Sequence, residues 1–153
     1  MTLSTQLRIH EKIDLDNLWN KCREITGIAP TDKRFSDRPE GSSRRVRSMD
    51  PGLGYNAWLW VNYWPEGHDP EVELKGLTDP DDIDYFSRQP RRVYYYDVGW
   101  DTTYGYRGPG GTGCSDLHRR FTRELGDWLD GLGADWIAKN EFTGEWGKRP
   151  MPD

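Results

Sequence analysis

Cysteine is scarce in this chain of 153 residues, which contains only Cys22 and Cys114. Two isolated thiols give little basis for a disulfide framework and favour a reducing compartment. No apolar run approaches the roughly 18 residues of a transmembrane helix. The first residues lack the basic segment and apolar stretch of a signal peptide. These shortages predict a cytoplasmic protein without membrane association.

The chain also lacks the spacing of familiar catalytic and metal-binding motifs. Its histidines, His10, His68 and His118, are far apart, and none belongs to a motif such as His-Glu-x-x-His. The acidic run over 79–84 lacks the glycine and terminal glutamate of a calcium loop. A Cys114–His118 nucleophile pair at a helix start is one alternative, and a surface histidine is the simpler interpretation. We therefore expect no catalytic residue, metal or cofactor, and a binding protein rather than an enzyme.

Apolar residues make up only 34% of the chain, whereas aromatic residues reach 13%. Each large ring buries about 150–250 Å², so rings should supply much of the core. The length suits one domain. We predict a single domain over 1–153, with an exposed, mobile loop over the breaker-rich residues 30–43 and a frayed tail over 147–153.

Apolar periodicity predicts two main helices. The first follows a cap at Asp14 and stops near Gly27, and the second begins near Ser115 and stops at Gly131 and Gly133. A short helix is predicted after Asp79-Pro80. Strands are predicted over residues 3–13, 44–49, 55–64, 71–75, 92–101 and 134–142.

This order predicts an α+β fold in which a mostly antiparallel sheet carries the two main helices on one face. The pattern is compatible with a ferredoxin-like (split βαβ) core, to which the strands over 44–49 and 71–75 are additions.

The strand over 55–64 predicts an aromatic surface. If Leu59 and Val61 face the helices, the opposite side carries tryptophans, and the neighbouring strand is expected to add more rings. This surface comprises Trp58, Trp60, Trp64, Tyr94, Tyr96 and Trp100. Because tryptophan and tyrosine dominate interface hot spots, the surface suits a protein partner or a homodimer. The alternative is a second core layer formed under the loop over 30–50 or the segment over 65–90.

Charge is unevenly distributed along the chain, whose net charge is −5. Residues 66–84 contain eight carboxylates and a single lysine, which should repel nucleic acid and attract basic partner surfaces. The chain also lacks an aromatic and basic RNA-binding motif, so a nucleic-acid partner is not expected. The carboxylates expected to contact a protein partner are Glu71, Glu73, Asp81 and Asp82. The alternative is a solvated connection.

A glycine-rich loop over 105–113 leads into the second main helix. Backbone N–H groups at a helix start and nearby arginines favour a phosphate. The residues expected to hold it are Arg107, Gly110, Gly111, Thr112, Gly113, Ser115 and Arg119. The loop lacks the lysine of a Walker A motif and the parallel context of a dinucleotide fingerprint. A simple connector with tight turns is the alternative.

Several segments in the last third to half of the chain resemble small uncharacterised proteins encoded by actinobacterial phages. These segments are Asp101–Tyr106, Gly113–His118, Trp128-Leu129 and Asn140–Trp146. The resemblance carries no assigned chemistry and implies a phage accessory protein in the host cytoplasm. We therefore predict a non-enzymatic protein that binds and inhibits or modulates a host defence or regulatory protein. Nucleotide or cyclic-nucleotide binding, as a sponge or a small enzyme, and a virion or assembly role are the alternatives.

Overall fold

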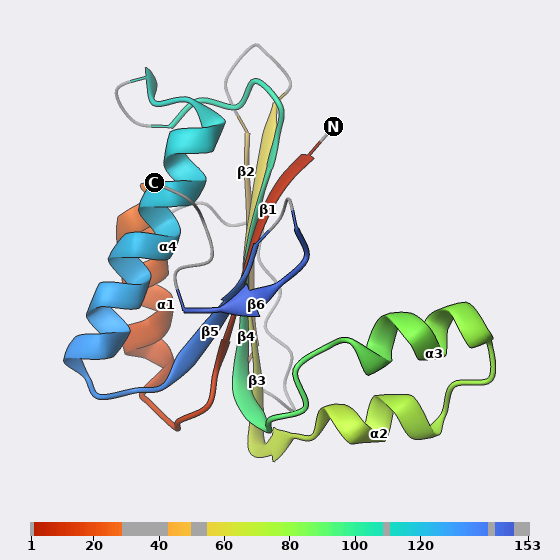
Figure 1. Ribbon diagram of the computed structural model, residues 1–153. Helices are drawn as coiled ribbons and strands as arrows, with labels where there is room; N and C mark the ends of the chain where they lie inside the picture. Colours follow the sequence, from red (N-terminus) through yellow and green to blue (C-terminus); the bar gives the residue numbers. More distant parts are fainter. Residues whose placement is uncertain (1, 29–42, 50–54, 109–110, 141–142, 149–153) are drawn as a thin grey trace.

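An antiparallel sheet forms the centre of the structure, a computed structural model that describes residues 2–28, 43–49, 55–108, 111–140 and 143–148 (Figure 1). Within these ranges the sheet has six strands, in the order β2-β3-β4-β1-β5-β6. The strands are β1 (Thr2–Ile9), β2 (Arg44–Met49), β3 (Asn56–His68), β4 (Tyr94–Thr103), β5 (Trp136–Lys139) and β6 (Trp146–Gly147). The chain therefore has the predicted α+β class.

Helices α1 (Leu15–Thr26) and α4 (Cys114–Gly131) lie together on one face of the sheet, as predicted (Figure 1). Helices α2 (Pro70–Lys75) and α3 (Pro80–Ser87) form a hairpin that projects away from the other side (Figure 1). Strand β4 lies between β1 and β3, and β5 lies on the outer side of β1. This order is compatible with a split βαβ core extended at its edges by β2 and β6.

The two main helices begin and end where the sequence predicts. Asp14 caps α1 by accepting a hydrogen bond from the backbone N–H of Asn17 at 2.8 Å, and Gly27 ends it with a φ of 73°. A left-handed residue at this position is the usual helix stop. In α4, apolar side chains recur every four residues and all of them are buried: Leu117, Phe121, Leu125 and Leu129. This spacing keeps them on one stripe, which faces the sheet.

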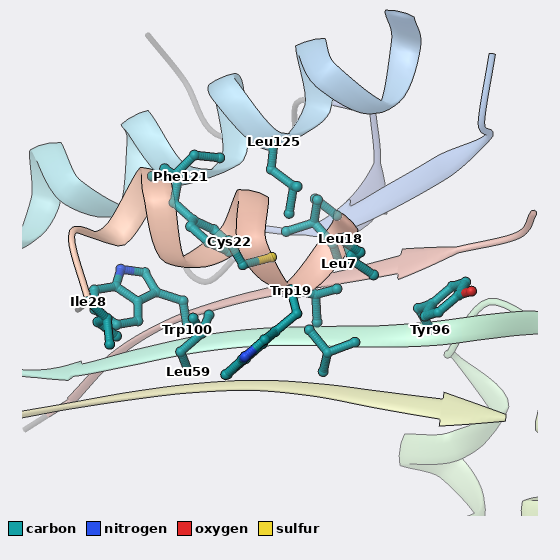
Figure 2. Packing of buried hydrophobic residues seen from close by; sticks show 14 of the residues in the cluster. Leu7, Leu18, Trp19, Cys22, Ile28, Leu59, Tyr96, Trp100, Phe121 and Leu125 are labelled. Atoms are coloured by element: carbon teal, nitrogen blue, oxygen red, sulfur yellow. The ribbon is translucent and has the colours of Figure 1, made fainter. Parts of the chain in front are cut away.

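The core fills the space between these helices and the sheet. Figure 2 shows Leu18, Phe121 and Leu125 of the helices above Leu59 and Trp100 of the strands. The ring of Trp100 lies roughly parallel to that of Phe121, with 6.2 Å between the centroids. Rings thus supply much of the buried volume, in line with the aromatic content of the sequence.

Two predictions are wrong at the end of β3 and just after it. The strand continues past Pro65 to His68, because the pairing with β4 shifts register between Tyr63 and His68. Such an irregularity releases Pro65 from the ladder of hydrogen bonds. The strand predicted over 71–75 is helix α2. Asp69 accepts a hydrogen bond from Glu71 N at 3.0 Å, and proline follows this cap, the same signal that correctly predicted α3.

Most of the predicted mobile loop over 30–43 and of the predicted frayed tail over 147–153 lies outside the described residues. At the end of the loop, the Ser43 hydroxyl accepts a hydrogen bond from the backbone N–H of Tyr63 at 3.1 Å. At the start of the tail, Gly147 pairs with Ala138 of β5. The end of the predicted loop and the start of the predicted tail are thus both held by the sheet.

Helix α4 approaches β5 closely at Gly126, where a Cβ would lie 2.4 Å from Cζ2 of Trp136. The indole is fixed, because its Nε1–H donates to Asp130 Oδ1 at 2.8 Å. We expect Gly126→Ala to destabilise the protein by about 1–3 kcal/mol, although alanine favours a helix by up to about 1 kcal/mol. Urea unfolding measures this change.

Gly131→Ala is the matched control, because it lies in the same helix and its Cβ would have no neighbour within 4 Å. This substitution should leave stability unchanged or raise it slightly. Equal stabilisation by both substitutions would contradict the close contact between α4 and β5.

Candidate functional site

The face of the sheet opposite α1 and α4 presents an ordered grid of polar and aromatic side chains. Because Ala57, Leu59 and Val61 of β3 face the core, the residues between them face the other way. One row across the strands is Arg45, Trp60, Gly99 and Gln6, and the next is Arg47, Trp58, Asp101 and Ser4. We call the surface made by these two rows the polar sheet face.

Tyr96 and Trp100 do not belong to this surface, contrary to the prediction. Trp100 pairs with Leu59 and Tyr96 with Tyr63 across β3 and β4, so their rings lie on the core side and are each 1% exposed. The sequence held a signal for this arrangement. Tyr96, Val98 and Trp100 alternate with Asp97, Gly99 and Asp101, and carboxylates favour the solvent side of a half-buried strand.

The remaining predicted rings separate into two groups. Trp58 and Trp60 lie half-buried on the polar sheet face. Trp64 meets Tyr94 edge-on at the base of the projecting hairpin, with 5.4 Å between ring centroids. Tyr94 is itself buried beneath the guanidinium of Arg8, which lies 4.5 Å from the ring centroid. The structure therefore brings Trp58 and Trp60 together and places Trp64 and Tyr94 in a structural cluster.

Gly99 fixes the position of Trp60. These residues are direct partners across β3 and β4, and an added Cβ at Gly99 would lie 1.8 Å from Cζ2 of the indole. The six-membered ring of Trp60 thus occupies the space that a side chain at position 99 would need. A tryptophan held in this way presents its outer side as a firm aromatic platform.

Two carboxylates flank Gly99 along β4. Asp97 accepts a hydrogen bond from Gln6 Nε2 at 2.9 Å, and burial raises the pKa of Asp97. Burial also raises the pKa of Asp101, although a hydrogen bond from the Ser4 side chain opposes the shift. Among the described residues, the buried Oδ1 of Asp101 has no hydrogen-bond partner. Carboxylates with raised pKa values beside cavities are candidates for ligand contact.

Two cavities meet at Trp60 and Asp101. One, of about 390 Å³, is lined by Ser4, Thr5, Gln6, Trp60, Asp101 and Lys139. The other, of about 410 Å³, is lined by Thr2, Arg45, Trp58, Trp60 and Asp101. Both volumes lie in the range of about 300–1,000 Å³ typical of small-molecule sites. The sequence alone does not indicate that Gly99, Asp101 and Gln6 share a site, because cross-strand register brings them together.

Helices α2 and α3, over residues 69–88, form what we call the acidic arm (Figure 1). None of the residues of α3 is buried. Val72 is 61% exposed and Tyr85 is 52% exposed, and Ile83 is exposed as well. Exposed apolar side chains on a projecting pair of helices are candidates for contact with a partner.

The four carboxylates predicted to contact a partner all lie on the acidic arm. Glu71 pairs with Arg91 at 2.9 Å, and Glu73 accepts from His68 Nε2 at 2.8 Å. Asp81 and Asp82 are exposed in the first turn of α3, where the helix dipole favours a negative charge. The structure thus gives the first two a role in holding the arm and leaves the second two accessible.

The glycine-rich loop surrounds a cavity of about 230 Å³ that includes Arg107, Gly113 and Ser115. Thr112 and Arg119 do not line this cavity, and Gly110 lies outside the described residues. The volume is below the range of about 300–1,000 Å³ for small-molecule sites.

The loop uses several of its own groups to close. Gly105 and Gly111 have φ angles of 99° and 79°, which only glycine adopts readily. Arg107 Nη1 donates to the Gly111 carbonyl at 3.1 Å. The Arg119 guanidinium lies 3.9 Å from the Asp116 carboxylate. These contacts favour the interpretation of the loop as a structural connector.

Cys114 and His118 do not form a nucleophile pair. The Cys114 thiol donates to the Tyr106 carbonyl at 2.9 Å. The His118 ring is bonded to the hydroxyls of Thr5 at 2.7 Å and Thr102 at 2.8 Å. The His118 side chain is only 2% exposed, so the expectation of a surface histidine is wrong as well. Burial lowers the pKa of His118 to about 4, and its ring is neutral at pH 7.

The described residues contain no group of three or more potential ligands that could hold a metal ion. Within the same ranges, no helix has the length and hydrophobicity needed to cross a bilayer. No protein-family model matches the chain, and no curated protein or solved structure matches it significantly. The polar sheet face and the acidic arm are therefore the two candidate binding surfaces of the described chain.

His118 makes the stability of the fold dependent on pH. Its pKa is about 4 when folded against 6.5 for an ordinary histidine, so the unfolded chain binds the extra proton between these values. The stabilisation is complete above pH 6.5 and is lost as the pH falls towards 4, by about 3 kcal/mol in all. Urea unfolding at a series of pH values measures this loss.

His118→Gln is the informative variant, because an amide can bond both threonines and does not titrate. Its stability should depend less on pH over this range. Some dependence should remain from His10, whose pKa burial also lowers. An unchanged pH profile would exclude His118 as the source.

Proposed function

We propose that this chain is a non-enzymatic binding protein that uses the acidic arm to bind a protein with a basic surface. The observation that carries this proposal is the exposure of Val72, Ile83 and Tyr85 on a projecting pair of helices. Apolar side chains surrounded by charge are typical of an interface core and its polar rim. In line with the resemblance to actinobacterial phage proteins, the partner is a host defence or regulatory protein that the chain inhibits or modulates in the host cytoplasm.

Charge supports a basic partner. Residues 69–88 contain seven carboxylates against Lys75 and Arg88. Arg88 is already paired with Asp84 of α3 at 3.0 Å, so the arm presents a strongly negative surface. Such a surface speeds encounter with a positive partner and disfavours nucleic acid.

The arm is held to the sheet at its base, which also supports a binding role. Trp146 Nε1 donates to Gln89 Oε1 at 3.1 Å, and the Arg91–Glu71 pair links the two ends of the hairpin. Lys139 of β5 donates to the Tyr85 hydroxyl at 3.4 Å. A surface fixed before binding loses less conformational entropy when the partner docks.

The test is affinity capture from an actinobacterial host lysate at low salt, with bound proteins quantified by mass spectrometry. Wild-type protein should enrich a stoichiometric host protein, and added salt should reduce the yield. A Val72→Ser, Ile83→Ser and Tyr85→Ser triple variant should lower the affinity for that protein at least about tenfold, since hot-spot residues contribute most of the binding energy.

Leu132→Ser is the matched control, because Leu132 is also an exposed apolar residue and follows α4, away from the arm. It should capture the same protein as wild type. Circular dichroism should show that all variants keep the fold. Equal capture by the triple variant would contradict the proposal.

A further inference from the structure

We propose that the platform formed by Trp60 on the polar sheet face is a carbohydrate-binding site that takes a neutral oligosaccharide. Among the described residues, the site lies on the sheet and borders the acidic arm only through Lys139, which lines one cavity and donates to the Tyr85 hydroxyl. This inference goes beyond the protein partner proposed above. It follows from one fixed ring, one buried carboxylate oxygen that has no hydrogen-bond partner among the described residues, and the donors and acceptors that surround the ring.

The ring supplies the apolar part of the site. Trp60 is held by contact with Gly99 and is half-buried, so one side of the indole lies on β4 and the rest is accessible. One side of a pyranose ring carries mainly C–H bonds, and these pack against the negative face of an aromatic ring. A fixed indole needs no rearrangement to accept a sugar.

The groups around the ring supply the polar part. Donors are present at Arg45, Gln6 and Lys139, and acceptors at Asp101 and Ser4. The buried Oδ1 of Asp101 has no partner among the described residues and calls for a donor. A sugar hydroxyl both donates and accepts, so a polyol can satisfy the carboxylate and the cationic groups together.

The charge of the lining favours a neutral ligand. The charged residues that line the two cavities are the cations Arg45 and Lys139 and the single carboxylate Asp101. A simple cation or anion would therefore meet repulsion from one part of the site.

The shape favours more than one sugar unit. The cavities of about 390 and 410 Å³ share Trp60 and Asp101. A ligand stacked on the indole can therefore extend to both sides along the sheet. A nucleobase offers no such extension without its phosphates, which the acidic arm nearby would repel.

The proposal is tested with gluco-, manno-, galacto- and N-acetylglucosamine oligosaccharides as probes. Saturation-transfer NMR identifies a series that binds, and titration calorimetry gives its Kd. At least one series should bind at millimolar concentration or below and should move the indole N–H signal of Trp60. Trp60→Ala should weaken that binding at least about tenfold, as expected for loss of a stacked ring.

Asp101→Asn keeps the size of the side chain and should also weaken binding, which secures the test if Trp60→Ala fails to fold. Tyr104→Ala is the control, because Tyr104 is an exposed ring outside both cavities, and it should bind as wild type does. The proposal is overturned if no saccharide binds at millimolar concentration, if binding survives Trp60→Ala, or if adenosine binds the platform and saccharides do not. None of these results bears on capture by the arm.

Discussion

The burial of large rings between one side of the sheet and the pair α1 and α4 is the constraint on which the rest of the structure depends. Both helices lie on the same side (Figure 1), so Trp100 and Trp136 are enclosed there. Among the described residues, no helix packs in the same way against the other side. That side must be stabilised by contacts between its own side chains, and these contacts produce the polar sheet face.

Arg8 shows how such contacts replace a second helical layer. Its guanidinium lies 4.5 Å from the ring centroids of both Tyr94 and Trp146, and Nη1 donates to the Pro90 carbonyl at 3.4 Å. A guanidinium between two rings gains cation–π attraction to both while its aliphatic stem is buried. Arg8 therefore joins β1, β4 and β6 to the base of the acidic arm. These contacts help to fix the orientation of the arm relative to the sheet.

Much of the fold could be predicted from the sequence, because local signals and packing agree. Asp14 and Gly27 mark the ends of α1, and the stripe from Leu117 to Leu129 identifies α4. The error at α2 arose where a run of alternating residues conflicted with a cap and a proline, and the cap prevailed. The site was less accessible, because the contact of Trp60 with Gly99 depends on register between strands distant in sequence. The prediction that Tyr96 and Trp100 lie on that face was wrong for a different reason, because the alternation within β4 already indicated that both rings face the core.

Strand β2 borders the described sheet on one side, with β3 as its neighbour. Its residues include Arg44, Arg45 and Arg47, and Arg44 reaches Asp16 of α1 at 3.4 Å. A bordering strand offers unpaired peptide groups to any other extended chain, and closely spaced cations discourage that addition. The arginines of β2 thus give this ring-rich protein a safeguard against growth into fibrils, since a second copy approaching through the same strand would meet like charge.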